Sequence, residues 1–342
     1  MPYRREVEQV RPMTIDSMER IELTQACSIG QLISNDLVRM EELMLDQVMD
    51  FHPDMKQAAR LILSSGGKRL RPRIILLTGR MLGAPHEALV TLAASIELLH
   101  NATLVHDDFI DGALLRRGIA TLNANWSPAA TILAGDFLFA SASALAAKTN
   151  SVKIMHLFSQ TLMTIVNGEV NQLFSANTPV DMDGYYRRIY AKTASLFETC
   201  SLSAAMLAGA DQSRCDALRR YGRDLGMAFQ IVDDILDYTG SEISAGKPVG
   251  GDLRQGLVTL PLLCHLKEFP QDELVMKMRG ESLSEKEVSV LYSRVVNGNA
   301  IRHARETAGD FICRAQTCLR EAPDGQEKDA LSAIAGGVLR SV

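Results

Sequence analysis

Two aspartate-rich stretches with the same spacing decide the architecture of this chain: LVHDDFID at residues 104–111 and IVDDILD at residues 231–237. Each has the pattern DDxxD inside an otherwise apolar segment. On an α-helix, residues four apart are neighbours on one face, about 6 Å apart along the axis. Each motif therefore predicts a helix with carboxylates on one stripe and hydrophobic side chains elsewhere. The carboxylates are Asp107, Asp108 and Asp111 in the first motif and Asp233, Asp234 and Asp237 in the second.

Carboxylates in apolar surroundings need counter-charges, because burying an unpaired carboxylate is costly. Oxygen ligands without nearby thiolates favour Mg2+, which keeps water ligands and bridges phosphates. A solvated acidic turn would explain a single DDxxD, but two apolar-flanked copies favour a metal site. A di-iron bundle would need Glu and Glu-x-x-His pairs, which neither segment supplies. The motifs predict two acidic walls that clamp a phosphate-bearing substrate through magnesium.

The composition narrows the class of protein. The 342 residues are 46% hydrophobic with a net charge of -5, which supports a large core and argues against nucleic acid as a partner. Six cysteines without CxxC spacing indicate reduced thiols and a cytoplasmic protein. The first residues lack the apolar stretch of a secretion signal. Asp136 interrupts the apolar run 129–147, so we expect a core helix there and no transmembrane segment.

Helical periodicity runs through most of the chain. Apolar residues recur at three- and four-residue spacing, for example over residues 32–49, 88–115 and 185–207. Alternating strand-like runs are essentially absent, and Gly and Pro residues separate the helical segments. No linker divides regions of different composition. We therefore predict an all-α fold, with an N-terminal extension over residues 1–24 and a single domain over residues 25–342.

Positive charges gather in the segment GGKRLRP at residues 66–72. The glycines let the backbone approach a ligand, while Arg and Lys side chains bind phosphate oxygens. Taken alone, a solvated helix start explains this segment equally well. Arg116 and Arg117 follow the first acidic motif closely enough to share its ligand. Other polar groups stand within apolar helices or just beyond the second motif: Lys192, Thr193, Gln230 and Lys247.

The order of several segments resembles that of the trans-isoprenyl diphosphate synthases, or polyprenyl synthetases. After GGKRLRP come HDDFID, LLRRG, LAGDFL, GEVNQL, AKTASLF, FQIVDDILD and GKPVGGDLRQGLVTLPLL. The resemblance runs from about residue 32 to the C-terminus. It implies the isoprenoid synthase fold, with helices surrounding a deep central cavity and usually a homodimer. It also implies Mg2+ at the cavity mouth, on the order of three ions when substrate is bound.

The same resemblance implies roles for individual residues. One set matches the magnesium ligands, with Asp108 in support and Asp237 acting through water: Asp107, Asp111, Asp233 and Asp237. A second set matches the pocket for the isopentenyl diphosphate headgroup: Lys68, Arg71, His100 and Arg117. A third set matches groups that hold the allylic diphosphate: Arg116, Lys192 and Lys247. Two further side chains match the oxygens beside the developing carbocation: Thr193 and Gln230. Two positions depart from the family pattern, since Leu257 replaces a frequent Lys and Ala120 a frequent Pro.

The implied reaction is the condensation of isopentenyl diphosphate with an allylic diphosphate, which releases diphosphate and lengthens an all-trans chain by one isoprene unit. Ala102 and Thr103 lie about one turn before Asp107, with Leu99 further along, and bulky aromatic residues form a floor near these positions in short-chain members. Because the side chains here are small, we expect a product of about thirty to fifty carbons, of the quinone side-chain type.

Three other functions remain alternatives. The chain could be a shorter-chain geranylgeranyl or farnesyl diphosphate synthase, a class I terpene cyclase, or a non-catalytic subunit of a synthase. A cyclase usually carries a different second metal motif, and a non-catalytic subunit typically loses one acidic motif. The expected partners are the two diphosphate substrates, a second copy of the chain, and a membrane surface contacted peripherally during product release.

Overall fold

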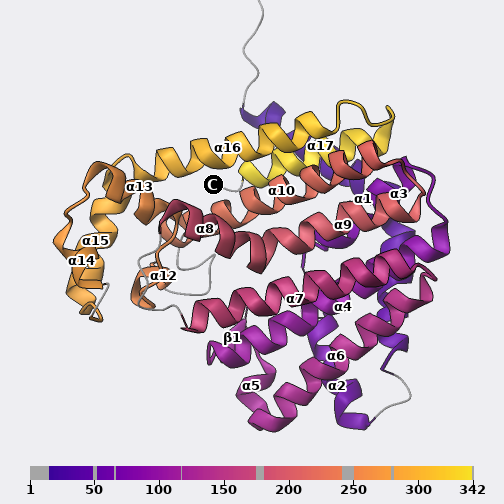
Figure 1. Cartoon of the computed structure of the whole chain (residues 1–342), viewed down its shortest axis with the longest axis horizontal. Helices are drawn as coiled ribbons and strands as arrows, with labels where there is room; N and C mark the ends of the chain where they lie inside the picture. The colour runs from indigo at the N-terminus through magenta and orange to yellow at the C-terminus, as the bar shows by residue number, and fades with distance from the viewer. Residues whose placement is uncertain are drawn as a thin grey trace, which may run out of the picture.

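The computed structural model describes residues 15–48, 52–64, 67–116, 118–174, 181–240, 250–278 and 281–340, with side chains from residue 31 onward except at position 64. Over these ranges the chain is helical apart from one two-stranded hairpin, which confirms the all-α prediction (Figure 1). The elements are α1 (Ile15–Asp46), α2 (Pro53–Ser64), α3 (Leu70–Met81), α4 (His86–Ile110), β1 (Leu115–Arg116), β2 (Ile119–Ala120), α5 (Leu122–Asn125), α6 (Pro128–Lys148), α7 (Val152–Phe174), α8 (Met182–Ile189), the π-helical turn η1 (Tyr190–Ala194), α9 (Ser195–Leu207), α10 (Gln212–Thr239), α12 (Gly251–Arg254), α13 (Leu260–Glu268), α14 (Glu273–Met278), α15 (Glu285–Asn297), α16 (Ala300–Cys318) and α17 (Gln326–Leu339).

Helix α4 runs through the middle of the molecule. Its residues from Leu89 to Ala102 are buried almost without interruption, because α6, α3, α9 and α1 all pack against it. Figure 1 shows α4 between α9 on one side and α6 on the other. A helix that is apolar on all sides belongs in a core. The carboxylates of the first motif therefore emerge at the end of a helix that the whole fold holds in place.

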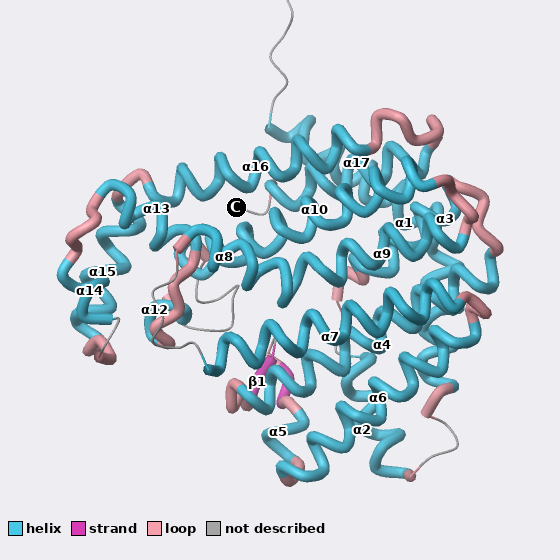
Figure 2. Tube along the Cα trace, in the orientation of Figure 1, coloured by secondary structure: helices cyan, strands magenta, loops and turns pink. Residues whose placement is uncertain are grey.

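Helix α10, which carries the second acidic motif, packs closely against η1 and α9. A Cβ atom added to Gly222 would lie 2.3 Å from the carbonyl oxygen of Phe197, and one added to Gly226 would lie 2.6 Å from the Cα atom of Ala194. Two glycines one turn apart thus allow the helix backbones to touch. Helices α16 and α17 cover the other side of α10 (Figure 2).

The hairpin after α4 differs from the prediction of a helix that continues to residue 115. Helix α4 ends at Ile110, where Gly112 adopts a positive φ of 63° and the Ala113 amide donates to the Asp108 carbonyl oxygen at 2.8 Å. Strands β1 and β2 then pair antiparallel, with Arg116 opposite Ile119. The chain reverses here because glycine tolerates the left-handed backbone that other residues avoid.

The cysteines agree with the prediction of reduced thiols. No disulfide joins the cysteines whose side chains are described, which are Cys200, Cys215, Cys264, Cys313 and Cys318. Cys27 lies outside the described side chains. The predicted domain boundary at residue 24 falls within α1, in a stretch where only the backbone is described, and it stays a prediction.

Candidate active site

The two leading aspartates of the first motif have different neighbours. Asp108 receives Arg116, whose Nε and Nη2 atoms both lie 2.8 Å from its Oδ1 atom, because the hairpin carries Arg116 back to the end of α4. Asp107 instead lies close enough to Lys192 and Glu169 for their charges to change its pKa. Successive helix residues are separated by about 100° around the axis. The adjacent aspartates Asp107 and Asp108 therefore face different sides of α4.

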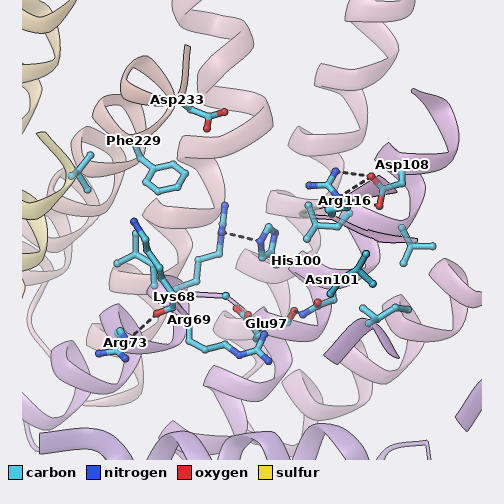
Figure 3. A pocket seen from close by; sticks show the side chains of 18 of the residues that line it. Lys68, Arg69, Arg73, Glu97, His100, Asn101, Asp108, Arg116, Phe229 and Asp233 are labelled. Atoms are coloured by element: carbon cyan, nitrogen blue, oxygen red, sulfur yellow. Dashed lines mark hydrogen bonds and ion pairs between the residues drawn. The ribbon is translucent and has the colours of Figure 1, made fainter. Parts of the chain in front are cut away.

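A pocket of about 840 Å³ opens on the Asp108 side of α4, between α3, α4, α10 and α17. Figure 3 shows Lys68, His100, Arg116 and Asp233 around it. Arg71 also lines this pocket. Three of the four residues predicted to bind the isopentenyl diphosphate headgroup, Lys68, Arg71 and His100, are thus brought together. The fourth, Arg117, lies outside the described residues.

Arg71 is held in an orientation suited to an anion. Its Nη1 atom lies 3.1 Å from Nε2 of His100, and its Cζ atom lies 4.7 Å from the centroid of the Phe197 ring. The Nε atom is buried without a hydrogen-bond partner. Burial lowers the pKa of Arg71, since the surroundings disfavour its charge. A buried guanidinium with an unused donor favours a phosphate or carboxylate ligand.

Arg69, which lies between Lys68 and Arg71 in the sequence, connects several helices. Its Nε atom lies 3.0 Å from Oε1 of Glu41, its Nη1 atom lies 3.0 Å from Oε1 of Glu97, and Nη2 donates to the Leu63 carbonyl oxygen at 2.6 Å. Its φ of 47° is left-handed, an uncommon conformation for a residue with a side chain. Arg69 therefore ties α1, α2 and α4 together at the start of α3. This leaves the other two cations of GGKRLRP for a ligand.

On the Asp107 side of α4, an ion pair joins α7 to η1. The Nζ atom of Lys192 lies 3.2 Å from Oε1 of Glu169. Burial lowers the pKa of Lys192, but the charges of Glu169, Asp107 and Asp111 outweigh burial and raise it. Burial raises the pKa of Asp107 to about 6, with Glu169 and Asp111 adding to the effect. A single half-buried ammonium is thus paired with Glu169 and influenced by the charges of Asp107 and Asp111.

The first two aspartates of the second motif, on α10, also differ in their surroundings. Asp233 is exposed and lines the pocket. Asp234 is buried, and burial raises its pKa to about 6. Its Oδ1 atom accepts a hydrogen bond of 2.9 Å from Nε2 of Gln230, and Thr193 donates to Oε1 of Gln230 at 2.5 Å. The two residues predicted to flank the carbocation are therefore hydrogen-bonded to each other and to the second acidic wall.

Asp237 connects α10 to the start of α12. Its two carboxylate oxygens accept hydrogen bonds of 3.1 Å from the backbone amides of Gly251 and Asp252, at the start of α12. Burial, together with the charges of Asp237, Asp234 and Asp233, raises the pKa of Asp252 to about 7. The charges of four carboxylates thus influence one another at this end of α10.

The donor set fits divalent cations. Both walls offer only oxygen ligands, and burial, with a smaller effect of neighbouring carboxylates, raises the pKa values of Asp107 and Asp252, so that a bound cation would stabilise their ionised forms. Within the described ranges, no three His, Cys, Asp or Glu side chains converge closely enough to hold a metal ion without further ligands. The walls suit a cation that takes its remaining ligands from water or from a phosphate group.

Comparison with known proteins identifies the family of this chain. Residues 52–295 match the family model described as polyprenyl synthetase. The octaprenyl diphosphate synthase of Haemophilus influenzae is 34% identical over 321 residues, which cover 93% of this chain and 98% of that protein. The chain belongs to the polyprenyl synthetase family. This membership confirms the predicted class of enzyme, a prenyltransferase of isoprenoid biosynthesis.

Solved structures of polyprenyl synthetases share the fold. A polyprenyl synthase from Caulobacter crescentus, complexed with calcium and isoprenyl diphosphate, superimposes with a TM-score of 0.86 at 33% identity, covering 92% of this chain and 97% of that one. A geranylgeranyl pyrophosphate synthase from Lactobacillus brevis gives a TM-score of 0.82 at 31% identity, covering 90% and 97%. The isoprenoid synthase fold predicted from the motifs is therefore confirmed.

The residues predicted to set product length are not part of the pocket lining. Leu99 and Ala102 are fully buried in the core. Thr103 is half-buried, and its hydroxyl donates to the His100 carbonyl oxygen at 2.8 Å. None of the three lines the headgroup pocket, and their role stays a prediction. The same holds for Lys247, which lies outside the described residues.

Sequence reasoning missed two carboxylates of this polyprenyl synthetase. Glu169 pairs with Lys192, and Asp252 joins the second wall. The segments GEVNQL and GGDLRQG contain them, but each carboxylate stands alone in its segment, without a motif-like spacing.

Leu257, which departs from the family pattern, donates its backbone amide hydrogen to the Asp252 carbonyl oxygen at 2.8 Å.

Proposed function

We propose that this chain is a magnesium-dependent all-trans polyprenyl diphosphate synthase. The observation that carries the proposal is the division of α4 into two ligand faces: a cationic pocket with Lys68, Arg71 and His100 on one side, and the ion pair of Lys192 with Glu169 beside Asp107 on the other. Two diphosphate substrates can approach the end of α4 from opposite sides. A synthase that joins two diphosphates needs such a pair of sites, whereas a terpene cyclase binds one.

The headgroup pocket binds isopentenyl diphosphate without breaking it. Lys68 and Arg71 contact phosphate oxygens, and His100 fixes the guanidinium of Arg71. Since this substrate keeps its diphosphate throughout the reaction, these contacts contribute binding and orientation. The double bond of the substrate then lies next to the end of α4, where the allylic carbon must come.

The other face of α4 promotes ionisation of the allylic substrate. Asp107 and Asp111 would hold ions at the end of α4, and Asp233, which lines the headgroup pocket from α10, would hold them from the facing wall, with Asp237 contributing through water. Bound Mg2+ supplies positive charge that stabilises the departing diphosphate. Lys192 adds a fixed positive charge on the same side. Concentrating cations where negative charge develops lowers the barrier to breaking the C–O bond.

After ionisation, the residues at the junction of η1 and α10 protect the carbocation. Thr193 and Gln230 place oxygen atoms there, and the apolar core below excludes water that would otherwise add to the cation. Attack by the double bond of isopentenyl diphosphate forms the new C–C bond, and a proton then leaves to form the new trans double bond. The released diphosphate accepts this proton.

We also propose a product of about thirty to fifty carbons, because the side chains of Ala102 and Thr103 are too small to form a floor. The octaprenyl product named for the Haemophilus influenzae relative supports this range. The likeness to a geranylgeranyl pyrophosphate synthase keeps a shorter product as the second candidate. Product mass distinguishes the two.

The proposal includes a homodimer in the cytoplasm. Helices α4 and α6 are both long and apolar enough to cross a membrane, but 72% of the apolar window of α4 is buried within the protein. In α6 only 44% of the window is buried, and the neighbouring helix α7 exposes a row of large hydrophobic side chains. A second copy of the chain would cover this surface. Exposed Leu114, Leu115 and Ile119 near the hairpin offer a peripheral membrane contact for product release.

A direct assay tests the proposed function. Purified protein is mixed with isopentenyl diphosphate, farnesyl diphosphate and Mg2+, and the products are identified by mass spectrometry; a parallel sample contains EDTA. We expect a ladder of all-trans polyprenyl diphosphates that EDTA abolishes and added Mg2+ restores. Cyclised hydrocarbon would favour a terpene cyclase. Absence of product from folded protein would favour a non-catalytic subunit.

A further inference from the structure

We propose that Tyr185 is a positioning residue for the condensation reaction. Through Asp234 and Gln230 it fixes the hydroxyl group of Thr193 so that the oxygen lone pairs, and not the proton, face the reacting allylic carbon. The inference rests on the proposed function and adds a residue to it. Tyr185 lies on α8, outside both acidic motifs and outside the predicted ligand sets.

Four side chains form a continuous hydrogen-bonded chain beside the second acidic wall. The Tyr185 hydroxyl donates to Oδ2 of Asp234 at 2.6 Å. The other oxygen of that carboxylate, Oδ1, accepts from Nε2 of Gln230 at 2.9 Å. The Thr193 hydroxyl donates to Oε1 of Gln230 at 2.5 Å. The three bonds run from the buried side of α8 to the catalytic end of η1.

The direction of each bond follows from chemistry. An ionised carboxylate can only accept, so Tyr185 and the Gln230 amide nitrogen must both donate to Asp234. The nitrogen of Gln230 is thereby committed, and its carbonyl oxygen is the atom left for Thr193. Since a carbonyl oxygen can only accept, the proton of the Thr193 hydroxyl points at Gln230. Thr193 then offers only lone pairs to a substrate.

This orientation matters for a reaction that passes through a carbocation. Lone pairs directed at a developing positive charge stabilise it, whereas a hydroxyl proton directed at it would repel it. A threonine hydroxyl can otherwise rotate between several hydrogen-bonding directions. Fixing it before substrate arrives removes the cost of reorientation during the reaction.

The π-helical turn lets both Tyr185 and Thr193, the two ends of this hydrogen-bonded series, contact α10. Thr193 follows Tyr185 by eight residues, which on a regular α-helix would rotate it by about 80° away from the face of Tyr185. The turn η1 widens the helix between them, and its contacts show the result: Tyr185 bonds to Asp234 and Thr193 to Gln230, one turn apart on α10. Single π-turns inserted in α-helices are frequent at functional sites.

The surroundings of Tyr185 favour a polar role over simple packing. Its side chain is fully buried, and the guanidinium of Arg188 lies over its ring, 5.6 Å from the centroid. Arg188 also donates to the Val258 carbonyl oxygen at 2.5 Å, which fixes the arginine. A phenylalanine would fill the same space. The hydroxyl is required only for its bond to Asp234.

The experiment compares two tyrosines that each donate one buried hydrogen bond. Tyr185→Phe removes the bond to Asp234, and the matched control Tyr221→Phe removes a 2.9 Å bond from a fully buried hydroxyl to the Leu331 carbonyl oxygen. We expect Tyr185→Phe to lower kcat about tenfold while the KM for isopentenyl diphosphate is retained. Tyr221→Phe should keep kcat and lose a similar amount of thermal stability.

Two further variants separate positioning from packing. Tyr185→4-aminophenylalanine keeps a donor at the same place and should restore kcat even if Tyr185→Phe melts at a lower temperature. In the background of Thr193→Val, adding Tyr185→Phe should change kcat by less than about twofold, because the group that Tyr185 positions is already absent.

The outcomes are distinguishable. Equal kcat values for Tyr185→Phe and Tyr221→Phe in an active enzyme would overturn the inference and leave the proposed function standing. A full additional loss in the Thr193→Val background would overturn it as well. A wild-type protein that makes no prenyl product would overturn the proposed function and the inference with it.

Discussion

At the scale of single residues, adjacent aspartates of the first motif have different surroundings and different roles. Asp107 lies in an acidic cluster with Glu169 and Asp111, whereas Asp108 is neutralised by Arg116. We expect Asp107→Ala to lower kcat by about three powers of ten with little change in melting temperature, because charge stabilisation at the leaving group is lost. Asp310→Ala, at an exposed aspartate of α16, is the control. Near-normal turnover of Asp107→Ala would contradict its role as a magnesium ligand.

The two diphosphate sites can be separated by kinetics on single substitutions. Lys68→Ala should raise the KM for isopentenyl diphosphate about tenfold or more and leave kcat nearly unchanged, because that headgroup is bound but not broken. Arg116 lines the same pocket but is paired with Asp108, next to the proposed magnesium ligand Asp107, so Arg116→Ala should act on the allylic substrate and lower kcat. Steady-state kinetics with each substrate varied in turn gives the answer. Equal effects of both variants on both substrates would show that the division of the pockets is wrong.

At the scale of elements, the contact between α7 and η1 holds the ion pair of Glu169 with Lys192. Gly168 makes this contact possible, since a Cβ atom there would lie 2.6 Å from Cβ of Ala191. We expect Gly168→Ala to push the elements apart and to lower kcat about tenfold. In Gly309→Ala on α16 the added Cβ atom meets only Cδ2 of Leu339 at 3.8 Å, so that variant should be as active as wild type and equally or more stable. Melting curves and kcat check both; an unchanged kcat in Gly168→Ala would contradict this role of the contact.

The course of the product along α4 is a second property of an element. Thr103 lies one turn before Asp107 on the same face, and Ala102 is buried beside it. A ring at either position should shorten the product to about fifteen to twenty carbons while condensation continues, because a packed interior cannot absorb it. Ala102→Phe should also cost about 1–3 kcal/mol of stability through overpacking. An unchanged long-chain product profile in both folded variants would exclude a tunnel along this part of α4.

At the scale of the whole molecule, an apolar surface on α7 determines the expected assembly. Met163 is 63% exposed, Val166 49% and Val170 42%, and this spacing puts them along one side of the helix. We expect Val166→Glu to convert a dimer into a monomer in size-exclusion chromatography with light scattering, because a charge in an apolar interface is costly. Val290→Glu on α15, where the valine is 47% exposed, should leave the dimer intact. A monomeric wild-type protein would contradict the homodimer.

The fold class and the reaction class can be predicted from the amino-acid sequence, because both depend on local patterns. Three- and four-residue periodicity specifies helices, and the two DDxxD motifs place carboxylates in apolar helices, which only cations and phosphates explain. The end of α4 was misjudged, since apolar residues continue through Leu115 while Gly112 turns the chain. A single glycine outweighed the periodic pattern there.

Which side chains act together depends on tertiary contacts and cannot be predicted from local patterns. That Asp108 pairs with Arg116 depends on a hairpin, and that Glu169 meets Lys192 depends on the packing of α7 against η1. The alignment of Tyr185 with Thr193 depends on a π-turn that periodicity does not predict. Each of these contacts joins segments whose separation is set by packing, and packing depends on the shapes of residues distant in the chain. Local motifs therefore predict the chemistry of the site, while packing between distant segments sets its geometry.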